Sequence, residues 1–307
     1  MIYYILLCVI LAIVFGGSYY AYRLAFYSPY KGRQDVPEVT DPHYAPYKAM
    51  MKDLFHDLRE KPCEFVTIQS LDGLTLSGRY YHQKDGAPLA IGFHGYKSSW
   101  LTDFCGGADI AWQMGQNILL VDERAQGKSQ GRTITFGIKE RWDIMCWIKY
   151  SLERFGPETK ILLYGVSMGG ATVLMASGME LPHNVKGIVA DSPYSAPLDI
   201  ILEVGRQKHY PIKLIKPFII LGAKIFGGFN VCETSGVEAV KNAKVPILII
   251  HGEDDSFVPT EMSHEIRQAN PEKIQLHTFP EAYHVLSYMV DTPRYRKLVK
   301  EFMSEVL

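Results

Sequence analysis

Short apolar runs alternate with segments of helical periodicity along most of the chain. The apolar runs are 65–68, 74–81, 89–93, 118–121, 161–164, 185–190, 247–250 and 274–279. The helical patterns cover 102–116, 138–155, 168–178, 260–270 and 294–306. Compact apolar runs are typical of parallel strands that are buried on both faces. The first two runs flank Asp72-Gly73 and predict a hairpin.

Strand–helix alternation after an initial hairpin predicts an α/β fold. We expect a mostly parallel, doubly wound sheet of eight strands, flanked by helices, within a domain at 62–307. In such folds the active site lies at the carboxyl ends of the strands.

One interval interrupts the alternation after the sixth strand. Residues 196–240 carry helical apolar patterns, at 198–204 and 212–226, but no strand. An insertion at this place in the fold predicts a small helical cap over the site. Most of its apolar side chains are expected to pack the cap onto the domain. The remainder would line an acyl pocket or touch a bilayer, which favours a lipid-like substrate.

The N-terminal segment is almost wholly apolar. No charged side chain occurs from Met1 to Tyr22. At ~1.5 Å per residue this segment is about long enough to cross a ~30 Å hydrocarbon core. The alternatives are a buried helix or a cleaved signal peptide, but the basic start of a signal peptide is missing. We therefore predict a single-pass membrane anchor at 1–23.

Polar residues follow the anchor. The first charges are Arg23, Lys31 and Arg33, which favour a catalytic domain on the cytoplasmic side. Residues 24–61 form a connector that ends in an amphipathic helix, in which apolar residues recur at helical spacing from Met50 to Leu58.

The overall composition excludes several classes of function. The 32 basic residues nearly balance the 33 acidic ones, so no nucleic-acid partner is expected. The five cysteines are scattered without C-x-x-C spacing. The scattered positions and the lack of C-x-x-C spacing argue against a disulfide framework or a zinc site and favour a reducing compartment.

The chemistry centres on Gly165-Val166-Ser167-Met168-Gly169. An apolar strand runs into this G-x-S-x-G sequence and a helix follows, which is the context of a nucleophile elbow. The sharp turn strains the backbone at its corner and leaves the Ser167 hydroxyl projecting from the sheet. Ser167 is therefore the predicted nucleophile, and a glycine-rich helix start is the alternative.

A serine hydroxyl needs a base and an orienting acid. His284 lies between the last strand and the last helix and is the predicted base. Two acids, Asp254 and Asp255, follow the seventh strand, and their spacing favours Asp255. The order Ser167, Asp255, His284 is the order expected of an α/β-hydrolase.

The oxyanion of the tetrahedral intermediate needs hydrogen-bond donors. We predict the backbone N–H groups of Tyr96, in the loop after the third strand, and of Met168, at the start of the helix after Ser167. His94 in the same loop is expected to be structural. Serine chemistry needs no cofactor or metal, and the sequence has no metal-ligand spacing such as H-E-x-x-H.

These motifs together resemble the α/β-hydrolase superfamily. They occur in order as 93–95, 122–129, 165–170, 191–194 and 251–259 with His284. They are most similar to bacterial esterase-type hydrolases that carry an N-terminal membrane segment. The resemblance implies the same nucleophile, acid, base and oxyanion donors. The segment 122–129 departs from the superfamily pattern, because Ala125 replaces a glycine and Gln126 stands where histidine is frequent.

The predicted function is hydrolysis of carboxylic esters or thioesters through an acyl-enzyme intermediate. A peptidase or acyltransferase could use the same triad, since fold does not fix function. A non-catalytic binding protein that retains the fold is the remaining alternative.

Overall fold

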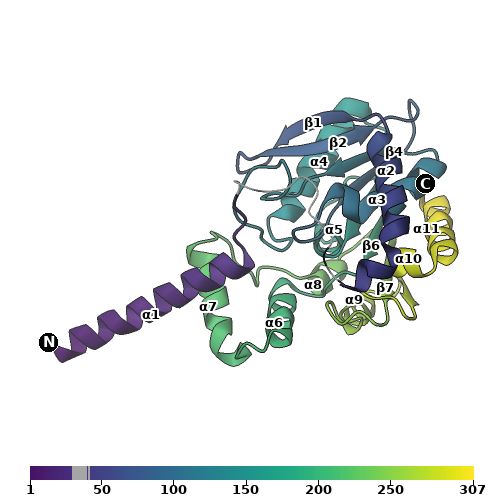
Figure 1. Ribbon diagram of the computed structural model, residues 1–307. Coiled ribbons are helices and arrows are strands. Elements are labelled where there is room, and N and C mark those ends of the chain that lie inside the picture. The colour runs from purple at the N-terminus through teal and green to yellow at the C-terminus, as the bar shows by residue number, and fades with distance from the viewer. Residues whose placement is uncertain (30–39, 41) are drawn as a thin grey trace.

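An eight-stranded sheet forms the centre of the computed structural model, which describes residues 1–29, 40 and 42–307 (Figure 1). The strands are β1 (Glu64–Gln69), β2 (Thr75–Tyr81), β3 (Leu89–Phe93), β4 (Asn117–Val121), β5 (Ile161–Val166), β6 (Val185–Asp191), β7 (Ile247–Gly252) and β8 (Ile274–Phe279). Their order across the sheet is β1-β2-β4-β3-β5-β6-β7-β8. Strand β2 runs antiparallel to both of its neighbours, and the pairs from β4 to β8 are parallel.

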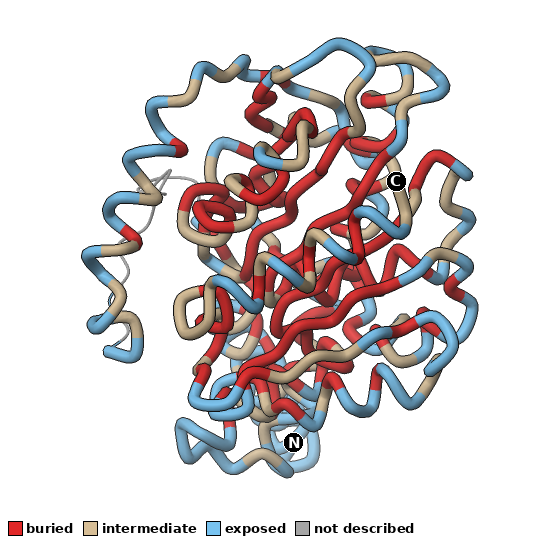
Figure 2. Tube along the Cα trace, turned by 90° about the vertical axis from the view of Figure 1, so that its right-hand side faces the viewer, coloured by how far each residue is buried: buried red, intermediate tan, exposed pale blue. Residues whose placement is uncertain are grey.

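Helices cover both faces of the sheet. One face carries α2 (Lys48–Glu60), α3 (Trp100–Gln113), α10 (Ser287–Val290) and α11 (Thr292–Val306). The other carries α4 (Glu140–Phe155), α5 (Met168–Ser177), α8 (Gly236–Val240) and α9 (Glu261–Ala269). The central strands are buried between these two layers, while the outer sides of the helices are exposed (Figure 2).

The predicted α/β-hydrolase architecture is confirmed, with differences at the ends of its elements. The helix expected at 102–116 begins at Trp100, because the Ser99 hydroxyl accepts a hydrogen bond from the Thr102 N–H and caps the helix. Two short helices, α10 and the 3₁₀ helix η1 (Pro42–Tyr47), have no counterpart in the sequence pattern.

Three helices occupy the interval between β6 and β7. They are α6 (Pro197–Gln207), α7 (Ile212–Ile225) and α8. Helix α8 packs against α5 and α9 on the body of the domain. Helices α6 and α7 instead contact one another, and α7 lies beside the N-terminal helix α1 (Ile2–Ala25) (Figure 1).

Helix α1 projects from the domain (Figure 1). Within the described residues it is the one helix that is long and apolar enough to span a membrane. Residues up to Ile13 are exposed, whereas Ser18 and Tyr22 are buried. Part of the connector expected at 24–61, including Lys31 and Arg33, lies outside the described residues.

The second half of α1 packs on α7 through small residues. A Cβ at Gly222 would lie 2.4 Å from the Ser18 carbonyl oxygen, and a Cβ at Gly17 would lie 2.8 Å from the Phe218 ring. Farther along the helices, the Phe226 ring meets Tyr19 edge-on at 5.2 Å. A third apolar cluster joins the end of α1 to α6, α7 and the elbow helix α5.

Candidate active site

Ser167 lies at the junction between β5 and α5. Its φ of 53° and ψ of −113° place it in a strained backbone region. Neighbouring glycines make the sharp turn possible. A Cβ at Gly169 would lie 1.8 Å from the Phe93 carbonyl oxygen, and a Cβ at Gly165 would lie 2.3 Å from the Gly169 carbonyl oxygen. The structure therefore has the geometry of a nucleophile elbow.

His284 links Ser167 to Asp255. The Ser167 Oγ lies 2.9 Å from His284 Nε2, and His284 Nδ1 lies 2.7 Å from Asp255 Oδ2. The carboxylate can only accept a hydrogen bond, so Nδ1 carries the proton and Nε2 accepts from the serine hydroxyl. The three side chains predicted from chain order thus form one hydrogen-bonded array.

The Asp255 carboxylate is buried, and both of its oxygens have polar partners. Its Oδ1 accepts hydrogen bonds from the Phe257 N–H at 3.0 Å and the Val258 N–H at 2.8 Å. His251 Nε2 lies 3.2 Å from Oδ2. Asp254 is exposed and takes no part in the array.

The electrostatics favour a charged Asp255 next to a basic His284. Burial opposes the imidazolium, but the charge of Asp255 and its hydrogen bond outweigh burial and raise the pKa of His284 above its ordinary value. Burial also opposes the carboxylate, yet His284 and His251 hold the pKa of Asp255 well below its usual range. His284 is therefore a stronger base than a free histidine.

The two predicted oxyanion donors belong to segments that adjoin Ser167. Met168 is the first residue of α5, and its N–H is one of the helix's unsatisfied donors. Gly95, which precedes Tyr96, is close enough that a Cβ there would lie 3.2 Å from Ser167 Cβ. Neither the Tyr96 N–H nor the Met168 N–H donates to a protein acceptor within the described residues.

A half-buried carboxylate, that of Asp103, holds the loop that contains Tyr96. Asp103 Oδ2 accepts from the Gly95 N–H at 2.6 Å, and Oδ1 accepts from the Ser98 hydroxyl at 2.6 Å. Burial raises the pKa of Asp103. His94 uses both ring nitrogens on backbone groups, namely the Gly95 carbonyl and the Glu123 N–H. His94 therefore stabilises the loop.

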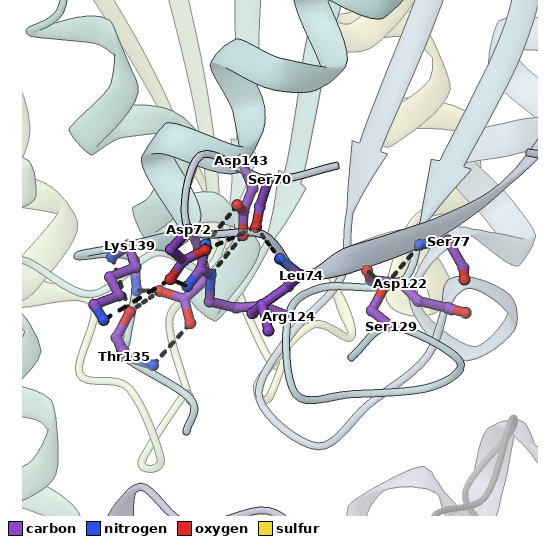
Figure 3. Close-up of polar contacts among 12 residues, drawn as sticks. Ser70, Asp72, Leu74, Ser77, Asp122, Arg124, Ser129, Thr135, Lys139 and Asp143 are labelled. Carbon is purple, nitrogen blue, oxygen red and sulfur yellow. Dashed lines mark hydrogen bonds and ion pairs between the residues drawn. The ribbon is translucent and has the colours of Figure 1, made fainter. Parts of the chain in front are cut away.

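The segment 122–129 braces the same loop. Gln126 Oε1 accepts a hydrogen bond from the Lys97 N–H at 2.5 Å, so the residue that departs from the superfamily pattern holds the turn after Tyr96. Arg124 anchors the segment by reaching between Asp72 and Asp143 (Figure 3). Arg124 lowers the pKa of Asp72 to about 2.

Several residues around the site were not singled out from the sequence. His251 donates from Nε2 to the Val258 carbonyl at 2.9 Å and therefore accepts from the Ser263 hydroxyl at Nδ1. Tyr44, in η1, donates to the His284 carbonyl at 3.0 Å. His251 belongs to the motif that carries Asp255, which is a usable signal, but nothing in the sequence distinguishes Tyr44 from other connector tyrosines.

Ser167 opens onto an apolar cavity of about 400 Å³. The predicted oxyanion residues Tyr96 and Met168 also line it. Apolar side chains of α6 and α7 line the cavity, including Ile201 and Ile219. Its size and lining suit a small organic molecule with an apolar portion.

Two family models match parts of the chain. Residues 92–212 match the model of the α/β hydrolase fold, and residues 219–301 match that of the dienelactone hydrolase family.

Two relatives cover much of the chain. The uncharacterized protein YqkD of Bacillus subtilis is 24% identical over 256 residues, which cover 83% of each chain. The uncharacterized membrane protein YNL320W of Saccharomyces cerevisiae is 23% identical over 195 residues, which cover 63% of this chain and 62% of that protein.

Among solved structures, an esterase of Pyrococcus furiosus, Pf2001, superposes with a TM-score of 0.66 at 24% identity. The superposition covers 90% of this chain and 99% of the esterase. The likeness extends over nearly the whole fold.

Proposed function

We propose that this chain, which has the α/β-hydrolase fold, is a serine esterase whose triad is Ser167, His284 and Asp255. One observation carries the proposal. A continuous hydrogen-bond chain runs from the strained Ser167 through His284 to the buried Asp255, and Ser167 opens onto an apolar cavity. This arrangement supplies an activated nucleophile beside space for an acyl group.

Acylation begins at the Ser167 hydroxyl. His284 Nε2 takes its proton as Ser167 Oγ attacks the ester carbonyl carbon, and Asp255 stabilises the resulting imidazolium. The tetrahedral oxyanion is held by the N–H groups of Tyr96 and Met168. His284 then gives its proton to the departing alcohol oxygen, which leaves an ester between Ser167 and the acyl group.

Deacylation repeats these steps with water. His284 removes a proton from the water as its oxygen attacks the acyl carbon, and then returns that proton to Ser167 Oγ as the carboxylic acid departs. Binding of the acid's apolar portion in the cavity aligns the carbonyl with the donors.

We also propose that α1 anchors the enzyme in a membrane. Its 24 residues are about 36 Å long, which exceeds the ~30 Å of a hydrocarbon core. The relative YNL320W, which is named as a membrane protein, supports this assignment. Arg23 is the first charged residue after the apolar stretch. Its positive charge favours the cytoplasmic side of the membrane for the catalytic domain.

The decisive test is Ser167→Ala, assayed on p-nitrophenyl acetate. We expect turnover to fall roughly 10³-fold or more, because the nucleophile is removed. The unaltered protein should bind a fluorophosphonate probe covalently and the variant should not. Ser304→Ala is a suitable serine control, because Ser304 is exposed on α11 and does not line the cavity. Unchanged turnover by Ser167→Ala would exclude the proposal.

A further inference from the structure

The cavity that ends at Ser167 has helix α1 as one of its sides. Residues of α1 that line it are Gly17, Tyr20, Ala21, Leu24 and Ala25. The facing side comes from α6 and α7, with Val204 and Phe218 among its residues. The helix that we assign to the membrane thus forms part of the binding cavity, here called the acyl pocket.

We propose that α1 is a wall of the acyl pocket, and that the pocket takes the acyl chain of an ester lipid directly from the membrane in which α1 is embedded. This inference rests on the esterase activity proposed above. It assigns the substrate class, which that activity leaves open, and it gives α1 a role in specificity besides anchoring.

Contacts fix α1 against the rest of the pocket. The close approach of Ser18 to Gly222 sets the position of α1 on α7. At the end of α1, the Tyr96 hydroxyl donates to the Ala25 carbonyl at 2.9 Å, and the Tyr22 hydroxyl lies 2.8 Å from Thr133 Oγ1. The loop that supplies an oxyanion donor is therefore hydrogen-bonded to the anchor helix itself.

The length of α1 brings the pocket to the bilayer. The exposed stretch Ile2–Ile13 is only about 18 Å long, which is too short for a ~30 Å hydrocarbon core. To span, α1 must also use the residues that pack on α7. Helix α7 and the pocket beside it then lie at the boundary between lipid chains and headgroups.

The surface of α7 suits that boundary. Leu214 is 69% exposed and Ile225 is 44% exposed, although both are apolar. The sequence from Val204 to Cys232 contains no acidic residue. It has five basic residues, Arg206, Lys208, Lys213, Lys216 and Lys224, all of them exposed. An apolar surface edged by lysines is typical of segments that lie in the membrane interface.

An ester lipid matches both ends of this arrangement. Its acyl chain leaves the bilayer beside α1 and remains in apolar surroundings, so little apolar surface is exposed to water during entry. Its ester group reaches Ser167 and the oxyanion donors at the inner end of the pocket.

The first test narrows the pocket from the α1 side. Full-length protein is placed in vesicles of phosphatidylcholine with a minor fraction of phosphatidylglycerol and assayed with p-nitrophenyl acetate and p-nitrophenyl palmitate. We expect Ala21→Trp to lower the palmitate-to-acetate ratio of kcat/KM about tenfold, because the new ring occupies the pocket.

Ala12→Trp is the matched control. Ala12 lies on the exposed half of the same helix and does not line the pocket. The control variant should keep both activities of the unaltered protein.

Leu24→Ala removes a pocket side chain that is 49% exposed, so it should fold normally, and we expect it to raise the same ratio. Ratios that are unchanged in Ala21→Trp and Leu24→Ala would overturn the role of α1 as a wall.

The second test separates delivery by the membrane from delivery by water. The palmitate ester is dissolved either in the vesicles that hold the enzyme or in separate vesicles. We expect hydrolysis to be at least several-fold slower in the second arrangement. Equal rates would overturn direct entry from the bilayer. Loss of acetate hydrolysis in the unaltered protein would instead reject the esterase proposal, so the two failures are distinguishable.

Discussion

Each oxygen of the Asp255 carboxylate has a different task. The N–H groups of Phe257 and Val258 hold Oδ1, which fixes the side chain, while Oδ2 faces His284. The fixed negative charge keeps His284 in the tautomer whose Nε2 accepts the Ser167 proton. A neutral amide at this position would keep much of the shape but would lose the charge and reverse the hydrogen bond.

Asp255→Asn should lower activity and move its pH dependence. Neutral His284 is the active base, and its pKa is raised, so kcat/KM of the unaltered enzyme should rise with pH through a midpoint above the ordinary histidine value of about 6.5. Removal of the Asp255 charge lowers that pKa, so the midpoint should move to lower pH. The rate should fall roughly 10³- to 10⁴-fold.

Measurement of kcat/KM for p-nitrophenyl acetate against pH checks both effects. Asp254→Asn is the control, because Asp254 is exposed and outside the array. If Asp255→Asn kept both kcat/KM and the pH midpoint of the unaltered enzyme, another group would be the acid.

The three residues of the proposed triad could be selected from the sequence because each lies in a loop whose position follows from its strand. The supporting residues could not be reached in the same way. Gln126 contacts Lys97, and Tyr44 contacts His284, across long stretches of chain and through backbone atoms. Such contacts require only a side chain of suitable length, so no local pattern marks them.

At the scale of elements, the junction of β5 with α5 depends on contact between backbones. Helix α5 lies so close to β3 that only glycine fits at position 169. This contact places the Met168 N–H beside the loop that carries Tyr96. The two proposed oxyanion donors are therefore held in register by packing between a helix and a strand.

Gly169→Ala should lower the free energy of unfolding by about 1–3 kcal/mol, because β3 and α5 must separate to admit the methyl group. Gly107→Ala is the matched control. A Cβ there meets nothing closer than 3.8 Å, and the change in the middle of α3 should stabilise the protein by about 0.5–1 kcal/mol. Urea unfolding of both variants measures the difference, and equal effects would refute the explanation.

The central strands were predictable because burial on both faces leaves an unbroken apolar run. Helix ends were less predictable, since a single capping residue such as Ser99 moves a boundary. Short helices such as α10 contain too few residues to show a period.

At the scale of the whole molecule, the pairing of α1 with α7 could not be predicted. A helix that is apolar on every side carries no pattern that selects one face. The small residues Gly17, Ser18 and Gly222 acquire meaning only when the two helices are placed together. Because the second half of α1 packs on α7, that half belongs to the folded domain.

The basic surface of α7 leads to a prediction about lipid composition. We expect replacement of Lys213, Lys216 and Lys224 by glutamine to weaken the preference for anionic vesicles several-fold, because lysines near such a surface are attracted to anionic headgroups. The readout is palmitate ester hydrolysis in vesicles with and without phosphatidylglycerol. Glutamine at Lys149, Lys273 and Lys297, which are exposed elsewhere on the domain, is the control. An equal change in both triple variants would contradict the prediction.

The hydrogen bond from Tyr96 to the Ala25 carbonyl has a consequence for the order of events during synthesis. Helix α1 precedes α7 in the chain, so under the proposed anchoring it enters the membrane before its partner α7 has been made. The acyl pocket can close only when α6 and α7 arrive, and His284 follows later still. The newly made chain therefore holds its first pocket residues in lipid until the last part of the active site has been translated.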